Sequence, residues 1–255
     1  MSEEKARLDL PLPPGYAALA AFNRDEFRGM ARRREQPYAF AREMNALFVT
    51  AAEFFQAARH YPIVFSRDGR TGGFVPVIVT GLEERRNLFV DDDGRWKPER
   101  YVPAYARRWP FFSVQIREEP DRSLVCVDPA GLEPGEPAFI DANGKPTAAW
   151  QDAERLINDM EGARRQSMAM MEQLARLELL EPFEAHGVER SGGSLRLSNM
   201  HRVSEAKLNR LADKQIKALM TKGMLSRIYA HLMSLENFQQ LLDLRIARKT
   251  NEAEN

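Results

Sequence analysis

The alternation of apolar and polar positions divides the chain into a strand-rich first part and a helical second part. Between residues 63 and 141, about six or seven short apolar runs alternate with polar turn residues, which is typical of an antiparallel sheet. Asp-Gly or Asn-Gly pairs at 68–69, 93–94 and 143–144 favour hairpins, since both residues of such a pair accept positive φ. We expect strands at residues 63–65, 74–82, 89–90, 114–117, 124–127 and 139–141.

Two short helices are predicted within this first part. Residues 50–60 carry Thr50 as an N-cap and Glu53 three positions later, which is the spacing of a capping box. Residues 98–109 form the second predicted helix, and Pro110 ends it. The turns of FVDDDG and FIDANG resemble each other, and we interpret them as the same hairpin used twice.

After residue 146 the apolar positions recur every three or four residues, which predicts a long amphipathic helix over 147–180. Residues 184–194 are predicted to be an exposed loop, and 195–203 are an ambiguous extended segment. The remaining expected helices cover residues 204–211, 213–221 and 224–235, the last continuing towards 246, with Gly223 as a break.

The order of sheet first and helices last predicts the α+β class. The expected architecture is a mostly antiparallel sheet with inserted short helices, one long helix and a C-terminal helical subdomain. We expect a flexible N-terminal arm over residues 1–20 and a β-rich α+β part over 21–146. Residues 147–248 would form the long helix and the helical subdomain packed on it, giving one compact unit, and 249–255 a disordered tail.

Charge and composition narrow the function classes. The 255 residues include 37 basic and 37 acidic ones, so the net charge of zero argues against a nucleic-acid partner captured by bulk electrostatics. The single cysteine excludes an intramolecular disulfide and a Cys-rich zinc site, and its apolar surroundings predict a buried thiol. No apolar run reaches the length of about 18 residues that a membrane span needs, and the charged N-terminus is not an export signal. We therefore expect a cytoplasmic protein without a transmembrane segment.

The motifs of common enzyme classes are missing from the sequence. It contains no G-x-S-x-G elbow, no G-x-G-x-x-G fingerprint, no P-loop and no paired-histidine metal spacing. The run Asp91-Asp92-Asp93-Gly94 does not fit a calcium loop. We expect no cofactor, and keep Glu53, Asp91 and His231 only as weak metal candidates. Whether the protein is an enzyme stays undetermined, with the absence of these motifs favouring a non-enzyme.

Aromatic and basic residues concentrate in residues 95–112, a combination suited to binding a peptide, an aromatic ligand or an anion. In the alternative interpretation, the aromatic rings enter the core and the arginines face solvent. The charged run 32–35 is interpreted as a solvated segment. The candidate binding residues are Trp96, Tyr101, Arg107, Arg108 and Trp109, with Tyr229 and His231 as weaker candidates.

Several ordered motifs, taken together, resemble the SapC-like family of bacterial proteins over residues 20–242. These motifs are YPIVF at 61–65, GFVPV at 73–77, NLFV at 87–90, GRW at 94–96, YVPA at 101–104, RRWPF at 107–111 and IYAHL at 228–232. The family name implies an association with S-layers or with peptide-transport and antimicrobial-peptide-resistance systems. A permease role conflicts with the lack of any spanning segment.

The leading hypothesis is a cytoplasmic accessory protein that binds a peptide or protein partner in a specialised bacterial uptake or peptide-tailoring system. One alternative is an enzyme that modifies a peptide or small molecule, with or without a metal. A second alternative is a structural, S-layer-associated subunit. The sequence leaves a homo-oligomer open.

Overall fold

The computed structural model describes residues 12–116, 119–188 and 194–254. Helices and antiparallel sheets make up the fold, which confirms the predicted α+β class. Each ladder between two named strands is antiparallel. None of the helices in the described ranges has the length and apolar character that a membrane span requires.

The chain divides into two compact units whose segments interleave along the sequence. Unit 1 comprises Met1–Arg42, Val90–Trp96 and Ala104–Gly162; unit 2 comprises Glu43–Phe89, Lys97–Pro103 and Ala163–Asn255. This division differs from the expected boundary at residue 146. The chain returns to unit 1 twice after leaving it, and a hydrophobic pattern along the sequence does not record such returns.

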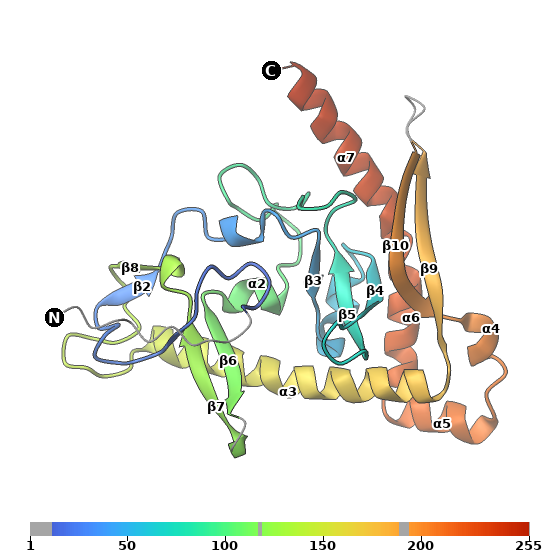
Figure 1. Cartoon of the computed structure of the whole chain (residues 1–255), viewed down its shortest axis with the longest axis horizontal. Coiled ribbons are helices and arrows are strands. Elements are labelled where there is room, and N and C mark those ends of the chain that lie inside the picture. Colours follow the sequence, from blue (N-terminus) through green and yellow to red (C-terminus); the bar gives the residue numbers. More distant parts are fainter. Residues whose placement is uncertain (1–11, 117–118, 189–193, 255) are drawn as a thin grey trace. The chain divides into compact units, whose positions relative to one another are not determined.

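Unit 1 holds a three-stranded sheet in the order β1-β7-β6 and a separate ladder of β2 with β8 (Figure 1). The N-terminal part of the long helix α3 (Ala148–Arg176) also belongs to this unit. Its other elements are β1 (Ala20–Ala21), β2 (Met30–Arg32), η1 (Ala39–Ala41), α2 (Ala104–Arg108), β6 (Phe111–Ile116), β7 (Glu119–Val127), η3 (Pro129–Gly131) and β8 (Leu132–Pro134).

Stacked aromatic rings form the centre of the unit 1 core. Phe22 stacks on Trp150 with a centroid distance of 4.1 Å and on Phe27 at 5.5 Å. Phe111 meets Trp150 and Phe139 edge-on. Trp150 lies on the apolar face of α3, so the periodicity that predicted this helix also identifies the face it buries.

The N-terminal segment is part of this core over the residues that are described. Residues 12–20 were expected to form a flexible arm, but Tyr16 and Leu19 are buried. The Tyr16 hydroxyl donates to the carbonyl of Phe111 at 2.7 Å, and the amide of Ala17 donates to Asp128. These contacts hold the segment in place, and residues 1–11 lie outside the described ranges.

Unit 2 is built on a five-stranded sheet in the order β3-β5-β4-β10-β9. Helix α6 packs against β4 and β10, and α1 packs against α6 (Figure 1). The strands are β3 (Ala46–Phe48), β4 (Ile63–Arg67), β5 (Phe74–Val79), β9 (Leu180–Val188) and β10 (Ser194–Val203). The helices, besides the end of α3, are η2 (Ala51–Glu53), α1 (Phe54–Ala57), α4 (Glu205–Leu208), α5 (Asp213–Thr221), α6 (Met224–Ser234) and α7 (Asn237–Glu254).

The hairpin of β4 and β5 confirms the two strands expected around Asp68, although its turn differs from the prediction. Gly72 rather than Gly69 has positive φ, and the loop closes through the amide of Gly72 on the carbonyl of Asp68. The Asp68 carboxylate accepts the amide of Arg70 and the hydroxyl of Thr71. A longer loop therefore replaces the expected two-residue turn.

The loop expected at 184–194 is wrong over its described residues. Residues 184–188 belong to β9, which pairs with β10, while 189–193 lie outside the described ranges. Strand β9 is an edge strand, and an edge tolerates Pro182, which had indicated the end of a helix. In the structure, intermediate and exposed side chains alternate along 181–187, as expected for a strand with one face towards solvent.

Three helix boundaries also differ from expectation. Only Ala104–Arg108 of the segment 98–109 is helical, because Glu99 has a φ of 60°. Helix α3 ends at Arg176, since Glu178 adopts a φ of 54° and the amide of Leu179 then bonds to the carbonyl of Leu174 in a Schellman motif. Helix α7 continues to Glu254, where a disordered tail was expected.

The turns at 91–95 and 141–145 have the same hydrogen bonds, which confirms the interpretation of one hairpin used twice. In each, the first aspartate accepts the amide four residues later on its carboxylate, at 2.7 Å for Asp91 and 2.8 Å for Asp141. The glycine adopts positive φ, 66° at Gly94 and 77° at Gly144. Val90 and Ile140 form single bridges, so the strands expected at 89–90 and 139–141 were wrong.

Alanine substitutions at these two glycines should differ in cost. Both impose left-handed backbone on a residue with a Cβ, which costs roughly 1–2 kcal/mol. At Gly94 the added Cβ would lie 2.7 Å from Cβ and 2.9 Å from Cα of Gln36, whereas at Gly144 it meets only the end of the Arg28 side chain at 3.3 Å. Gly94→Ala should therefore lower the free energy of unfolding by clearly more than Gly144→Ala in urea titrations. Equal losses would contradict this account.

Candidate functional site

An open pocket of about 600 Å³ lies within unit 1. Four of its lining side chains are arginines, most of the others are apolar, and one is an aspartate. We call it the arginine pocket. Its lining residues are Ala31, Arg32, Arg33, Arg34, Pro37, Tyr38, Arg107, Pro137, Phe139, Ala149, Asp152, Ala153 and Leu156.

Strand β2 and the residues after it deliver three consecutive arginines to the pocket. Arg32 ends β2, opposite Leu132 of β8. The amide of Arg33 donates to the carbonyl of Gly131 at 2.9 Å, and the amide of Arg34 donates to the carboxylate of Glu133 at 3.1 Å. The amides of Arg33 and Arg34 are thus bound to Gly131 and to the side chain of Glu133, and these two bonds hold the segment after β2 against β8.

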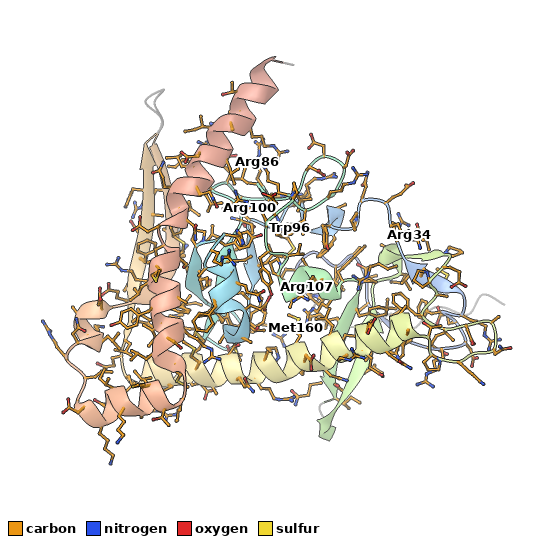
Figure 2. All side chains as sticks on the ribbon, turned by 180° about the vertical axis from the view of Figure 1, so that it is seen from behind. Arg34, Arg86, Trp96, Arg100, Arg107 and Met160 are labelled. Carbon is orange, nitrogen blue, oxygen red and sulfur yellow. The ribbon has the colours of Figure 1, made fainter. Side chains whose placement is uncertain are left out.

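Two of these guanidinium groups are anchored on backbone carbonyls. Arg32 donates to the carbonyl of Arg107 at 2.8 Å, and Arg34 donates to the carbonyl of Glu136. Figure 2 shows Arg34 beside the β2–β8 ladder and Arg107 on α2. A carbonyl fixes the direction of a guanidinium without neutralising it, so the anchored side chains keep their full positive charge.

The positive charge of the pocket is poorly compensated. Among the described residues, no carboxylate forms an ion pair with Arg32, Arg33 or Arg34. Asp152, the one acid of the lining, lies 3.4 Å from the guanidinium of Arg155. Burial lowers the pKa of Arg32, and the nearby hydroxyls of Tyr38 and Tyr16 oppose that shift.

The floor of the pocket is continuous with the core of unit 1. Phe139 and Ala153 are buried members of the core, and Ala149 packs against it. Leu156 adds a half-buried side chain from the same face of α3. Guanidinium groups therefore stand beside an apolar surface, an arrangement that can hold a ligand with both an anionic and an apolar part.

The structure places the predicted binding residues mostly in the core. Trp96 is buried and meets Tyr38 edge-on, with ring centroids 5.7 Å apart. Trp109 is buried and stacks on Phe40 at 4.7 Å. Arg107, which is exposed and lines the arginine pocket, is the predicted residue that the structure brings to this site.

Arg108 differs from its neighbour Arg107 because its side chain is buried. Its guanidinium carbon lies 4.2 Å from the ring centroid of Phe112 and 4.6 Å from that of Tyr105. Aromatic faces thus surround this cation. The alternative interpretation expected buried aromatic rings and arginines in solvent. The rings around Arg108 are buried or half-buried, but Arg108 is buried as well.

Glu53 and Tyr101 belong to unit 2, where they contribute to one hydrogen-bond network. The Glu53 carboxylate accepts both the amide and the hydroxyl of Thr50, which confirms the predicted capping box. Its other oxygen accepts the Tyr101 hydroxyl at 2.9 Å. These bonds account for a buried carboxylate without a metal ion.

His231 is fully buried in α6, with both ring nitrogens engaged by backbone. Nε2 accepts the amide of Val203 at 3.1 Å, so Nδ1 carries the proton and donates to the carbonyl of Ile63 at 2.8 Å. Burial is the main cause that lowers its pKa to about 4. A ring held in this way has no nitrogen to offer a metal or a ligand.

The remaining candidates lie apart from the pocket lining. Asp91 uses its carboxylate in the turn described above. Tyr229 is 41% exposed on α6, and its role in binding stays a prediction. Cys126 is buried as expected, and burial raises the pKa of its thiol to about 11. In the described part of the chain, no group of three or more His, Cys, Asp or Glu side chains is placed to hold a metal.

Comparison with known protein families finds a match over most of the chain. The family model described as SapC matches residues 22–241. The chain belongs to the SapC family. The match agrees with the resemblance expected over residues 20–242, and it spans both compact units. No curated protein and no solved structure matches the chain.

Sequence reasoning missed the importance of the arginine run at 32–34. It was interpreted as a solvated segment, although Arg32 is half-buried and donates to the carbonyl of Arg107, a residue 75 positions away. The available signal was three consecutive cations directly after Met30 and Ala31. Nothing in that run indicates that α2 lies beside it.

The buried His231 should make stability depend on pH. Its pKa in the folded state, about 4, lies below the ordinary value of 6.5, so the unfolded chain binds the proton more readily. Stability from this group is full above pH 6.5 and is lost as the pH falls towards 4, by roughly 3 kcal/mol. His60 and His201, whose pKa values burial also lowers, act in the same direction.

Urea unfolding between pH 7 and pH 4 should therefore show a weaker pH dependence in His231→Gln than in the wild type. His231→Gln should also be less stable at pH 7, because it disturbs two buried hydrogen bonds. His186→Gln is the matched control, since the His186 side chain is exposed. Parallel pH profiles for His231→Gln and the wild type would refute the assignment.

Proposed function

We propose that this protein is a cytoplasmic accessory protein that binds a peptide or protein partner, and that the arginine pocket is its recognition site. The partner would belong to a specialised bacterial uptake or peptide-tailoring system, which the family name suggests. The observation that carries this proposal is the run Arg32, Arg33 and Arg34, which forms no ion pair with an acid among the described residues and lies beside an apolar floor within one open pocket.

The size and chemistry of the pocket support binding by a small segment of a partner. Ligand pockets commonly have volumes of roughly 300–1,000 Å³ and combine apolar walls with a few placed polar groups. The arginine pocket, at about 600 Å³, lies within that range. Arginine is also enriched among the residues that dominate the energy of protein interfaces.

A reaction in this pocket has less support than binding. Catalysis by acid and base requires titratable groups that converge on a reacting atom. The described lining contains no histidine, cysteine or lysine, and its one carboxylate faces Arg155 at 3.4 Å. Besides Asp152, the described lining offers only the Tyr38 hydroxyl for proton exchange, so these residues are better suited to orienting an anion than to acid–base chemistry.

Selection from a random dodecapeptide library displayed on phage tests this function without a known partner. Peptides enriched on the wild-type protein should bind Leu156→Glu at least about ten-fold more weakly, because that change places a carboxylate in the apolar floor. Gln151→Glu is the matched control, since it adds the same charge to an exposed position of α3 outside the lining. Fluorescence anisotropy of synthetic copies would give the affinities.

Two results would count against the proposed function. One is a selection that enriches no peptide on the folded wild-type protein. The other is a set of enriched peptides whose affinity is the same for Leu156→Glu and for Gln151→Glu. Circular dichroism of both variants would establish that each is folded before its affinity is compared.

A further inference from the structure

We propose that the arginine pocket reads an acidic-hydrophobic peptide segment, in which a carboxylate lies next to an apolar side chain. This inference rests on the proposed function, because it names the chemical class of the ligand of the same site. In the proposed arrangement the carboxylate meets the guanidinium groups of Arg33 and Arg34. The apolar side chain lies against Phe139 and Leu156.

The charge balance around the pocket is the first reason. Its lining carries Arg32, Arg33 and Arg34, which form no ion pair with an acid among the described residues, and one aspartate, Asp152, which lies 3.4 Å from Arg155. The nearby carboxylates accept backbone amides rather than these guanidinium groups: Glu133 accepts the amide of Arg34, and Glu136 accepts the amide of Ala138. Arg32 is half-buried, and Arg33 and Arg34 are exposed, so an anionic ligand can approach all three guanidinium groups.

The roles of the three consecutive arginines differ, and this difference is the second reason. Arg32 and Arg34 each spend one donor on a carbonyl, which restricts their side chains before any ligand arrives. Within the described residues, the guanidinium of Arg33 has no hydrogen-bond or ion-pair partner. Arg33 is exposed, so its whole fork of donors is available to a carboxylate.

The apolar floor is the third reason, because it excludes a bare anion as the best ligand. A free inorganic ion could contact the guanidinium groups, but it would leave the apolar surface of the pocket uncovered. A ligand with an apolar side chain beside its carboxylate covers that surface as well. Burial of apolar area contributes roughly 25 cal/mol for each Å² removed from water.

Asp152 favours a peptide carboxylate over a phosphate group. It stands in the lining as a hydrogen-bond acceptor, and peptide amides can donate to it. A phosphate monoester carries close to two negative charges near pH 7 and would be repelled more strongly by Asp152 than a singly charged carboxylate. Asp152 therefore disfavours a dianion at its own end of the pocket, although the guanidinium groups attract either anion.

Synthetic peptides derived from the library selection test the inference. The enriched sequences should share Asp or Glu next to a large apolar residue. Replacement of that acid by its amide should weaken binding to the wild-type protein by about ten-fold or more, which corresponds to the loss of one charged hydrogen bond. Raised salt should weaken the acidic peptide more than its amide form.

Two substitutions connect each part of the peptide to its own part of the pocket. Arg33→Ala should weaken the acidic peptide by about ten-fold and leave the amide peptide nearly unchanged. Leu156→Ala should weaken peptides that contain the apolar residue and spare those in which it is alanine. Arg24→Ala, at an exposed arginine of unit 1 outside the lining, is the control and should retain wild-type affinities.

The outcomes separate this inference from the function on which it rests. If enriched peptides depend on Leu156 but their amide forms bind as tightly, the ligand class is wrong and the binding function stands. If inorganic phosphate displaces the peptides at micromolar concentration, the pocket reads phosphate rather than an acidic peptide. If no peptide depends on the pocket, the proposed function fails and the inference fails with it.

Discussion

The hydrogen bond from the guanidinium of Arg32 to the carbonyl of Arg107 is the interaction on which the candidate site depends. It joins the end of β2 to α2, and the two residues are 75 positions apart in the sequence. Because this cation is satisfied by a carbonyl and not by a carboxylate, its charge remains unneutralised beside the pocket. The amides of Arg33 and Arg34 donate to the carbonyl of Gly131 and to the carboxylate of Glu133, and these bonds position the two residues. Removing the anchor would free the Arg32 side chain from α2, while the β2–β8 ladder and the bonds to Gly131 and Glu133 would still hold the backbone of the segment.

Buried polar groups in this protein illustrate how similar residue types take different roles. Glu53 caps a helix and accepts a tyrosine hydroxyl, and His231 bridges two backbone groups in neutral form. Arg108 is surrounded by aromatic faces. Each is a residue type that often marks chemistry, yet each here satisfies a requirement of the fold, since a buried polar group needs a partner. Arg32 and Arg34 differ because their carbonyl partners leave the charge in place.

The repeated turn shows which parts of the fold follow from local sequence. In both copies an aspartate side chain accepts an amide four residues later, and a glycine supplies the left-handed backbone that closes the turn. These bonds lie within five residues, so the sequence pattern alone was sufficient to predict them. The capping box at Thr50 and Glu53 was predictable for the same reason. By contrast, β9 was missed because pairing with β10 stabilises it, and that pairing is visible only across the hairpin.

The sequence by itself determined the α+β class, the family, the long amphipathic helix, the strands β4, β5, β6 and β7, and the absence of common catalytic motifs. Short-range periodicity and turn chemistry encode these features, and they act over a few residues. Only the tertiary structure decided that Trp96 and Trp109 enter the core, that Arg107 lines a pocket while Arg108 does not, and that Arg32 lies beside α2. Burial depends on contacts between segments far apart in the chain, and no local pattern records which segments meet. The composition likewise gives a net charge of zero, whereas the fold places Arg32, Arg33 and Arg34 together beside one apolar surface.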